Sequence, residues 1–276
     1  MISTIIFSEG NPLRLDALMV SIYKNAANVF NNGTVIYKSN TETSEEAYEI
    51  AKRSMYSFIP EWKKCFNLKE QVVATLESIK DPFVCFLSDG DLIYRDINDE
   101  AMEVTKAFED PSVLCLSMRL GSNTIKCYFT GIDNRLYGQE VDENIMKFDW
   151  QKHYMDYSNP YSMNGTIFRT TEILKMIKKL QFNSALELED ALHLFGDYPK
   201  NKMAAFNTSA LVTIPTNEVK AMVRNAKPLP PENDVEVSKG FILGERIDLD
   251  SMNFSDIDAC YVEKNYLLKS ITANVR

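Results

Sequence analysis

The stretch Phe83-Val-Cys-Phe-Leu-Ser-Asp-Gly-Asp91 joins a short apolar run to an acidic turn. Residues 83–87 are typical of a buried strand, and Asp-Gly is typical of the sharp turn after one. Other short apolar runs lie at residues 4–8, 34–37, 112–116 and 211–214. Apolar residues recur at helical spacing at 13–30, 68–79, 99–108, 171–180 and 186–195, and a further helix is expected to begin at Ser44. Alternating strands and helices predict an α/β protein with a mainly parallel, Rossmann-like central sheet and helices on both faces.

The composition is that of a globular protein and excludes several classes. The chain has 276 residues, of which 45% are apolar and 25% charged, and its net charge is −9. These values exclude a disordered or collagen-like chain, and the negative charge argues against a nucleic-acid footprint over the whole surface. No window is apolar enough for a membrane span, and the N-terminus lacks the basic start of a signal peptide. We therefore expect a cytoplasmic protein.

The cysteines and histidines give no metal pattern of their own. Five cysteines occur without Cys-x-x-Cys spacing, and there are only two histidines, so no His-rich zinc site can be built. Cys85 and Cys115 lie within apolar runs, where a thiol is expected to act as a small core residue.

The acidic turn is the sharpest chemical feature of the chain. Asp89 and Asp91 are separated by Gly90, so their carboxylates can turn toward one point. Hard oxygen ligands suit Mg²⁺ or Mn²⁺, which take substrate phosphates as further ligands. Ligands of parallel α/β sheets bind at the carboxyl ends of the strands, where this turn falls. An ordinary Asp-Gly turn is the alternative.

The Asp-x-Asp motif in this setting resembles the GT-A-fold, nucleotide-sugar-dependent glycosyltransferases. Further segments resemble that family in the same order along the chain: 7–15 (FSEGNPLRL), 35–39 (VIYKS), 117–128 (SMRLGSNTIKCY), 157–169 (YSNPYSMNGTIFR), 182–189 (FNSALELE) and 214–219 (IPTNEV). The chain departs from the family at Asn11, where arginine is usual, and at Asn164 and Thr166, where aspartate and histidine are usual. The resemblance covers roughly residues 1–225.

The resemblance implies roles for several residues. The donor-binding set would be Ser8, Glu9, Arg14, Lys38, Ser39, Asp89 and Arg119, with Ser8 to Asn11 and Lys38-Ser39 at the nucleotide. Asp89 would contact the ribose or the metal, and Asp91 would be the firmer metal ligand. The planar fork of arginine suits a phosphate or sugar hydroxyl, although a structural ion pair would also explain Arg14 and Arg119.

A second acidic cluster contains Glu187, Glu189 and Asp190. A carboxylate beside an apolar helix face can serve as a base toward an acceptor hydroxyl, and Glu189-Asp190 resembles the Glu-Asp pair that supplies this base in inverting members of the family. A solvated acidic face is the alternative. His193 would approach the same site as a metal ligand or hydrogen-bond partner, or be structural.

The chain is expected to have three parts, because the pattern becomes irregular near residue 120 and residues 227–232 (KPLPPE) are typical of a stiff turn or linker. Residues 1–120 would be the nucleotide-sugar-binding half, residues 121–227 the irregular, acceptor-side and catalytic half of the same domain, and residues 228–276 a C-terminal appendage of strand and loop. Aromatic residues gather in the second part and would form a sugar-binding wall or pack beneath a loop: Phe148, Trp150, Tyr154, Tyr157 and Tyr161.

The expected function is metal-dependent transfer of a sugar, with Mn²⁺ or Mg²⁺, from a nucleotide-sugar donor (UDP-linked by the resemblance) to a saccharide hydroxyl. Residues 152–227 have a net charge of +3 and residues 228–258 a net charge of −6. The basic stretch keeps open a hydroxylated DNA base as the acceptor, because DNA binding needs phosphate contacts. A nucleotidyltransferase lacks support, since no Gly-rich, Lys-bearing loop lies near residue 10. A non-catalytic saccharide- or Ca²⁺-binding module is the remaining alternative.

Overall fold

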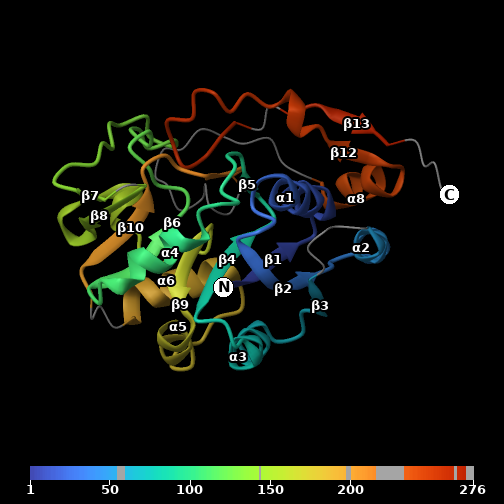
Figure 1. Ribbon diagram of the computed structural model, residues 1–276. Helices are drawn as coiled ribbons and strands as arrows, with labels where there is room; N and C mark the ends of the chain where they lie inside the picture. Colours follow the sequence, from blue (N-terminus) through green and yellow to red (C-terminus); the bar gives the residue numbers. More distant parts are fainter. Residues whose placement is uncertain (55–59, 143, 197–199, 216–232, 264–265, 272–276) are drawn as a thin grey trace.

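The computed structural model describes residues 1–54, 60–142, 144–196, 200–215, 233–263 and 266–271. A nine-stranded sheet runs through the centre of the described chain (Figure 1). Its strands, from one edge to the other, are β3 (Glu61–Lys64), β2 (Phe30–Lys38), β1 (Ile2–Glu9), β4 (Phe83–Ser88), β9 (Thr166–Arg169), β6 (Val113–Ser117), β10 (Lys202–Phe206), β8 (Ile145–Asp149) and β7 (Glu140–Asp142).

The sheet is parallel where the sequence pattern is most regular. Strands β3, β2, β1 and β4 are parallel neighbours, and so are β6 and β10. Strand β9 lies antiparallel between β4 and β6, and β8 and β7 are antiparallel at the far edge. The predicted α/β fold with a mainly parallel central sheet is confirmed, but the inserted strand β9 falls in a region that showed no strand pattern.

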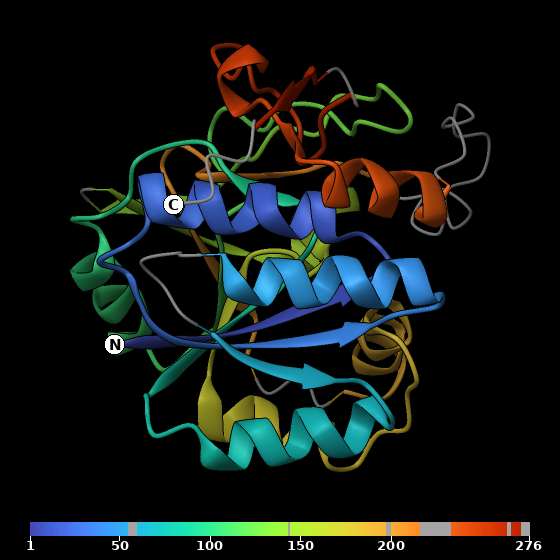
Figure 2. The same ribbon diagram turned by 90° about the vertical axis from the view of Figure 1, so that its right-hand side faces the viewer.

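Helices cover both faces of the sheet (Figure 2). The α-helices are α1 (Pro12–Asn25), α2 (Glu42–Arg53), α3 (Leu68–Ser78), α4 (Ala101–Glu109), α5 (Thr170–Ile177), α6 (Ala185–Phe195) and α8 (Asp234–Ile242). Helices α1 and α4 contribute side chains to one core cluster, and α3, α5 and α6 to a second one. Single turns of 3-10 helix lie at η1 (Trp150–Lys152), η2 (Met155–Ser158) and η3 (Leu249–Ser251).

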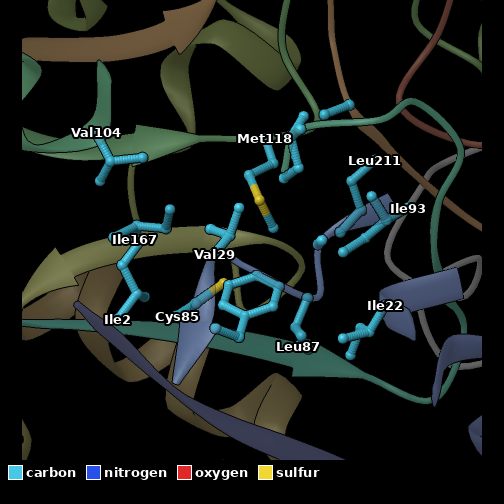
Figure 3. Packing of buried hydrophobic residues seen from close by; sticks show 14 of the residues in the cluster. Ile2, Ile22, Val29, Cys85, Leu87, Ile93, Val104, Met118, Ile167 and Leu211 are labelled. Carbon is cyan, nitrogen blue, oxygen red and sulfur yellow. The ribbon is translucent and has the colours of Figure 1, made fainter. Parts of the chain in front are cut away.

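Alternation along the central strands explains the two clusters. In β4, Cys85 and Leu87 belong to the first cluster with Ile22 of α1, whereas Val84 and Phe86 belong to the second. Figure 3 shows Cys85 and Leu87 beside Ile22, Val29 and Met118. Successive side chains of a strand point to opposite faces, so an unbroken apolar run marks a strand that is buried on both. The expectation that Cys85 is a core residue is confirmed, since its exposed fraction is 0%.

Two expected elements end differently. The helix expected at 13–30 ends at Asn25, and the strand expected at 34–37 begins earlier, because residues 30–38 form β2 through Asn31 and Asn32. Strand β2 pairs with β1 through its backbone while those two side chains stay exposed. The hydrogen bonds of a sheet join backbone groups, so a strand can continue through polar residues whose side chains face solvent.

The described C-terminal residues pack against helices of the N-terminal half. Helix α8, where strand and loop were expected, packs against α1 and α2, and Phe241 and Cys260 are fully buried. Two small sheets complete this side: β5 (Asp91–Ile93) with β11 (Leu211–Thr213), and β12 (Glu245–Ile247) with β13 (Leu268–Ser270). In the described parts of the chain, no helix is both long and apolar enough to cross a membrane.

Candidate functional site

A cleft of about 320 Å³ opens at the carboxyl ends of β1, β2 and β4. The eleven predicted site residues are all described by the structure, and six of them line this cleft: Ser8, Glu9, Arg14, Lys38, Asp89 and Glu189. The other five lie outside its lining: Ser39, Asp91, Arg119, Asp190 and His193. Ser8 and Glu189, which are 181 positions apart in the sequence, therefore meet at one place, where open parallel sheets bind their ligands.

Asp89 is held against the end of β1. Its Oδ2 accepts hydrogen bonds from Ser8 Oγ at 2.9 Å and from the Glu9 backbone N–H at 3.1 Å. Ser8 Oγ also lies 2.7 Å from the Tyr48 hydroxyl of α2, which accepts the Asn11 backbone N–H at 3.2 Å. Burial, and then the Asp89 carboxylate, raise the pKa of the Tyr48 hydroxyl. The loop after β1 is thus fixed before any ligand arrives.

The end of β2 and the loop after it contribute Lys38 and Asn40 to the cleft, whereas Ser39 between them lies outside its lining. Lys38 Nζ lies 2.5 Å from Glu9 Oε1, and both side chains are about half exposed at the rim. Ser39 Oγ donates to Glu45 of α2, outside the cleft lining. Its predicted contact with the nucleotide stays a prediction.

Asp91 lies beneath the cleft and is fully buried. Its Oδ1 accepts from Thr213 Oγ1 at 2.6 Å and Asn164 Nδ2 at 3.0 Å, and its Oδ2 accepts from the Ser88 backbone N–H at 2.8 Å. Burial raises its pKa from 3.8 to about 6. In this structure the expected metal ligand instead joins three segments by hydrogen bonds, at Thr213, Asn164 and Ser88. The sequence did not indicate this structural role.

Gly90 allows the acidic turn to pack closely against the backbone of Ile214. A Cβ atom on this residue would lie 2.7 Å from the carbonyl oxygen of Ile214, closer than real Cβ atoms come to other atoms. The Asp-Gly-Asp spacing therefore serves a close approach of two backbones as well as the placement of the carboxylates.

The two predicted arginines differ in position. Arg14 lines the cleft, and its Nη1 donates to the Ile214 carbonyl at 3.2 Å. Arg119 is fully enclosed, with Nη2 donating to Ser162 Oγ at 2.7 Å and its guanidinium 5.3 Å from the centre of the Tyr261 ring. Among the described residues, Arg119 Nε and Nη1 have no hydrogen-bond partner. Its predicted contact with a phosphate or sugar stays a prediction.

The structure separates Glu189 from its neighbour Asp190. Helix α6 begins at the Ser184 N-cap, whose side chain accepts the Glu187 N–H, and it turns Glu189 into the cleft. Glu189 Oε1 accepts from Asn159 Nδ2 at 2.7 Å, and Oε2 accepts from the Met163 N–H at 2.9 Å. Both hydrogen bonds fix the direction of the carboxylate, and it lines the same cleft as Asp89.

His193 does not join the two aspartates in a metal site. Its Nε2 lies at hydrogen-bond distance from Asn159 Oδ1, and its ring meets Tyr161 edge to face. Burial lowers its pKa. Within the described ranges, no group of three or more His, Cys, Asp or Glu side chains is placed to hold a metal ion. The expected trio of Asp89, Asp91 and His193 is thus not formed, because α6 directs the imidazole toward Asn159.

The charges that line the cleft still fit a cation that arrives with a phosphate ligand. Among the residues that the structure describes, four carboxylates line it, from Glu9, Asp89, Glu189 and Asp234, and two cations, Arg14 and Lys38. These side chains together would present an excess of negative charge to a diphosphate. Mg²⁺ commonly takes only one or two protein carboxylates and completes its shell with phosphate oxygens and water, and Asp89 is the half-buried carboxylate at the turn.

Several cleft residues were not predicted. Asn164 of the irregular half lies in the cleft and bonds to both Ser88 and Asp91, and the resemblance had marked its position. Asp234 reaches the cleft from α8, with its carboxylate against Gly10. Asn233 before it is a helix N-cap signal, but the sequence does not show which part of the sheet that helix covers.

The expected aromatic wall is instead mostly core. Phe148, Trp150, Tyr157 and Tyr161 are all at most 9% exposed, whereas Tyr154 is 52% exposed. The Tyr157 hydroxyl donates to the backbone carbonyls of Gly121 and Thr124. Packing beneath an irregular segment, the alternative at the sequence level, is what these rings do.

Comparisons with known proteins support the fold. No family model matches the chain, and no curated protein matches it in sequence. The crystal structure of S. aureus TarS is similar with a TM-score of 0.50 and 14% identity, covering 88% of this chain and 42% of TarS. Its fragment 1–349 in complex with UDP has a TM-score of 0.47 and 17% identity, covering 76% of this chain and 58% of that one.

A third similar structure is 4-diphosphocytidyl-2C-methyl-D-erythritol synthase from Anaerococcus prevotii, with a TM-score of 0.44 and 13% identity over 79% of this chain and 92% of that one. At such identities a likeness shows the fold alone. The chain is therefore an α/β protein with a mainly parallel central sheet and a fold similar to that of TarS, and it spans less than two thirds of the TarS chains.

Proposed function

We propose that the protein is a glycosyltransferase that moves a sugar from a nucleoside-diphosphate sugar to a hydroxyl of a saccharide, with the help of a divalent metal ion. The observation that carries the proposal is the meeting of Ser8, Asp89 and Arg14 with Glu189 in one cleft at the carboxyl edge of the sheet. TarS, whose fold is similar, has been crystallised with UDP, which agrees with a nucleotide in such a cleft.

The residues of the β1 and β2 ends are assigned to the donor. The fixed loop of Ser8 and Glu9, with Lys38 opposite, would hold the nucleoside. Asp89 would accept hydrogen bonds from the ribose hydroxyls or bind the metal ion together with the phosphates. The metal ion would neutralise charge on the departing diphosphate. Arg14, buried in the cleft wall, would face the phosphates with a charge that is always present.

Glu189 is assigned to the acceptor. Its carboxylate lies in the cleft and is oriented by Asn159 and the Met163 backbone. In this role it takes the proton of the acceptor hydroxyl while the hydroxyl oxygen bonds to the anomeric carbon and the bond to the diphosphate breaks. Asp190, outside the cleft lining, is the less suitable base.

The placement of basic residues favours a saccharide over DNA as the acceptor. Lys220, Arg224 and Lys227 lie outside the described residues. Five of the other basic residues of the 152–227 stretch form ion pairs with carboxylates: Lys152, Arg169, Lys178, Lys200 and Lys202. Charges that are already compensated release fewer counterions when they contact phosphates.

The proposal is tested by incubating the purified chain with UDP-, GDP- and dTDP-sugars and measuring release of the nucleoside diphosphate, with water as the acceptor. We expect one of these donors to be hydrolysed, the activity to disappear with EDTA and to return with Mn²⁺ or Mg²⁺. Hydrolysis that survives complete chelation would contradict the metal. Failure to hydrolyse any of the donors in either metal would contradict transfer itself.

A further inference from the structure

A second cavity, of about 500 Å³, lies beside the cleft and has no part in the function proposed above. One wall is the turn around residues 126–131 and the other is the C-terminal stretch 251–263. Figure 1 shows these two segments, green and red, side by side above the sheet. Its volume is within the range of about 300–1,000 Å³ that is common for ligand sites.

The two walls are joined firmly. The backbone N–H groups of Ile125 and Lys126 both donate to the Asp258 carbonyl, at 2.9 and 3.0 Å, and Lys126 Nζ lies 2.5 Å from Asp258 Oδ2. Asn123 Nδ2 donates to the Ile257 carbonyl at 2.9 Å. The cavity is therefore defined by bonds across its walls.

The lining combines aromatic rings with carboxylates. Tyr128, Phe254 and Tyr261 line the cavity and are each partly buried. Phe254 stacks on Tyr94 at 5.7 Å, and Tyr261 carries the Arg119 guanidinium over its ring, so both rings are held rigidly. Rigid aromatic faces bind the apolar faces of sugar rings at a small cost in entropy.

The polar part of the lining accepts hydrogen bonds and repels anions. Of the described residues, Asp256, Asp258 and Glu263 line the cavity together with Lys126, which is paired with Asp258. The formal charge of these described side chains is −2. Carboxylates accept hydrogen bonds from hydroxyl and ammonium groups, whereas phosphates and uronates would meet repulsion.

The cavity and the cleft are neighbours. Thr213 lines the cleft. Its backbone N–H donates to the Cys260 carbonyl at 3.0 Å, and its carbonyl accepts from the Val262 N–H at 3.1 Å, so these two hydrogen bonds flank Tyr261. Tyr261 and Val262 line the cavity. Thr213 of β11 thus forms an isolated parallel bridge with Tyr261, so residues in direct backbone contact line the two spaces. The Arg119 guanidinium lies over the Tyr261 ring.

We propose that this second cavity binds the non-reacting units of an oligosaccharide acceptor that is uncharged or carries amino groups, an inference that rests on the function proposed for the cleft. The aromatic rings hold the sugar rings, and the carboxylates hold their hydroxyl or ammonium groups. The negative lining disfavours DNA and acidic glycans at the same place.

The experiment measures binding of defined probes to the full chain by ligand-observed NMR and calorimetry, without donor or turnover. The probes are maltotriose, chitotriose, its deacetylated amino counterpart, trigalacturonate and a short DNA duplex. We expect a neutral or amino trimer to bind, and Tyr128→Ala to weaken it at least tenfold. Tyr23→Ala, at an exposed tyrosine of α1 outside the cavity lining, is the matched control and should change nothing.

A second variant keeps the test independent of folding. Asp256→Asn alters an exposed carboxylate and should weaken the amino trimer more than the neutral ones. The proposal is overturned if none of the neutral or amino trimers binds, if their binding is the same in Tyr128→Ala and Asp256→Asn as in the wild type, or if DNA or trigalacturonate binds more tightly. Donor hydrolysis without saccharide binding would reject this inference alone, whereas saccharide binding without donor hydrolysis would reject the proposed function alone.

Discussion

At the scale of the residue, two aspartates one glycine apart have different surroundings. Asp89 is half-buried in the cleft, whereas Asp91 is fully buried and accepts hydrogen bonds from three donors. Desolvation disfavours the charged form more strongly than these bonds favour it, so the pKa of Asp91 rises to about 6. The two carboxylates are therefore expected to respond differently to the same substitution.

The pKa of Asp91 predicts a pH-dependent contribution to stability. Because the folded state binds this proton more tightly than the unfolded state, the contribution is complete below pH 3.8 and is lost as the pH rises through about 6. The shift corresponds to about 3 kcal/mol. Urea titrations at pH 4, 5, 6 and 7 measure the unfolding free energy of the wild type and of Asp91→Asn. The stability of the wild type relative to the variant should fall by about 2 kcal/mol over this range, since part of the contribution is already lost at pH 4.

The asparagine variant is the suitable reference, since it keeps the shape of the side chain without the titration. If the difference for Asp91 were constant from pH 4 to pH 7, the carboxylate would be ionised throughout, and the burial argument would fail.

Glu189 provides the residue-scale prediction for activity. Glu189→Gln should lower donor hydrolysis at least about 100-fold, since the amide cannot take the proton, while the affinity for the nucleotide changes less than about twofold. Calorimetry with UDP and a diphosphate-release assay measure the two effects. Glu187→Gln, at an exposed position of the same helix, is the control and should retain wild-type rates. Loss of activity in Asp190→Asn with retention in Glu189→Gln would assign the base to Asp190.

At the scale of the element, the β1–α1 loop and α8 depend on each other at Gly10. Gly10 has a φ of +69°, and a Cβ on it would lie 2.7 Å from Asp234 Oδ2. Gly10→Ala should therefore destabilise the protein by about 1–2 kcal/mol for the left-handed backbone and by a further amount for the contact with α8. It should also weaken UDP binding, because the loop lines the cleft.

Gly138 separates the two contributions. Its φ is +67°, and no atom lies within 4 Å of an added Cβ, so Gly138→Ala carries the backbone cost alone. Thermal unfolding of both variants measures the difference between them. In the double variant Gly10→Ala/Asp234→Ala, the part of the destabilisation that comes from the contact with Asp234 should disappear. Equal destabilisation by the two glycine substitutions would show that α8 does not press on the loop.

At the scale of the whole molecule, the C-terminal residues are expected to unfold together with the sheet. Phe241 of α8 is fully buried in a cluster with Leu13 and Ala17 of α1, against which Trp62 of β3 also packs. Phe241→Ala should lower the free energy of unfolding by about 3–5 kcal/mol. The fluorescence of Trp62 and Trp150, which lie near the central sheet, follows the unfolding of the main body in urea.

Leu243→Ala is the matched control, because Leu243 is 81% exposed and surface changes usually stay within about 0.5 kcal/mol. If the C-terminal residues were an independent appendage, Phe241→Ala would leave the tryptophan transition unchanged. A separate transition for α8, detected by circular dichroism before the tryptophan signal changes, would lead to the same conclusion.

The sequence correctly predicted the helices and strands whose residues follow a regular apolar pattern. The strand at 83–88 and the helices near 68–78 and 185–195 follow from apolar periodicity, which reports burial directly. The acidic turn and the ends of β1 and β2 were expected at the site because parallel strands bring their carboxyl ends to one edge. Glu189 was a candidate on other grounds, as a carboxylate beside an apolar helix face and through the family resemblance. What failed locally was strand β9, a four-residue strand whose pairing partners lie about 50 and 80 residues away.

The sequence by itself determined the α/β class, the central strands and the edge of the sheet at which polar residues gather, since these depend on periodicities of two and 3.6 residues. Only the tertiary structure decided which acidic residues face the cleft, that Asp91 is buried beneath it, and that Asp234 and the stretch around Tyr261 come back to the site. The physical reason is that exposure and pKa depend on neighbours brought together by chain closure over 100 residues or more, and no local pattern encodes which neighbours those are.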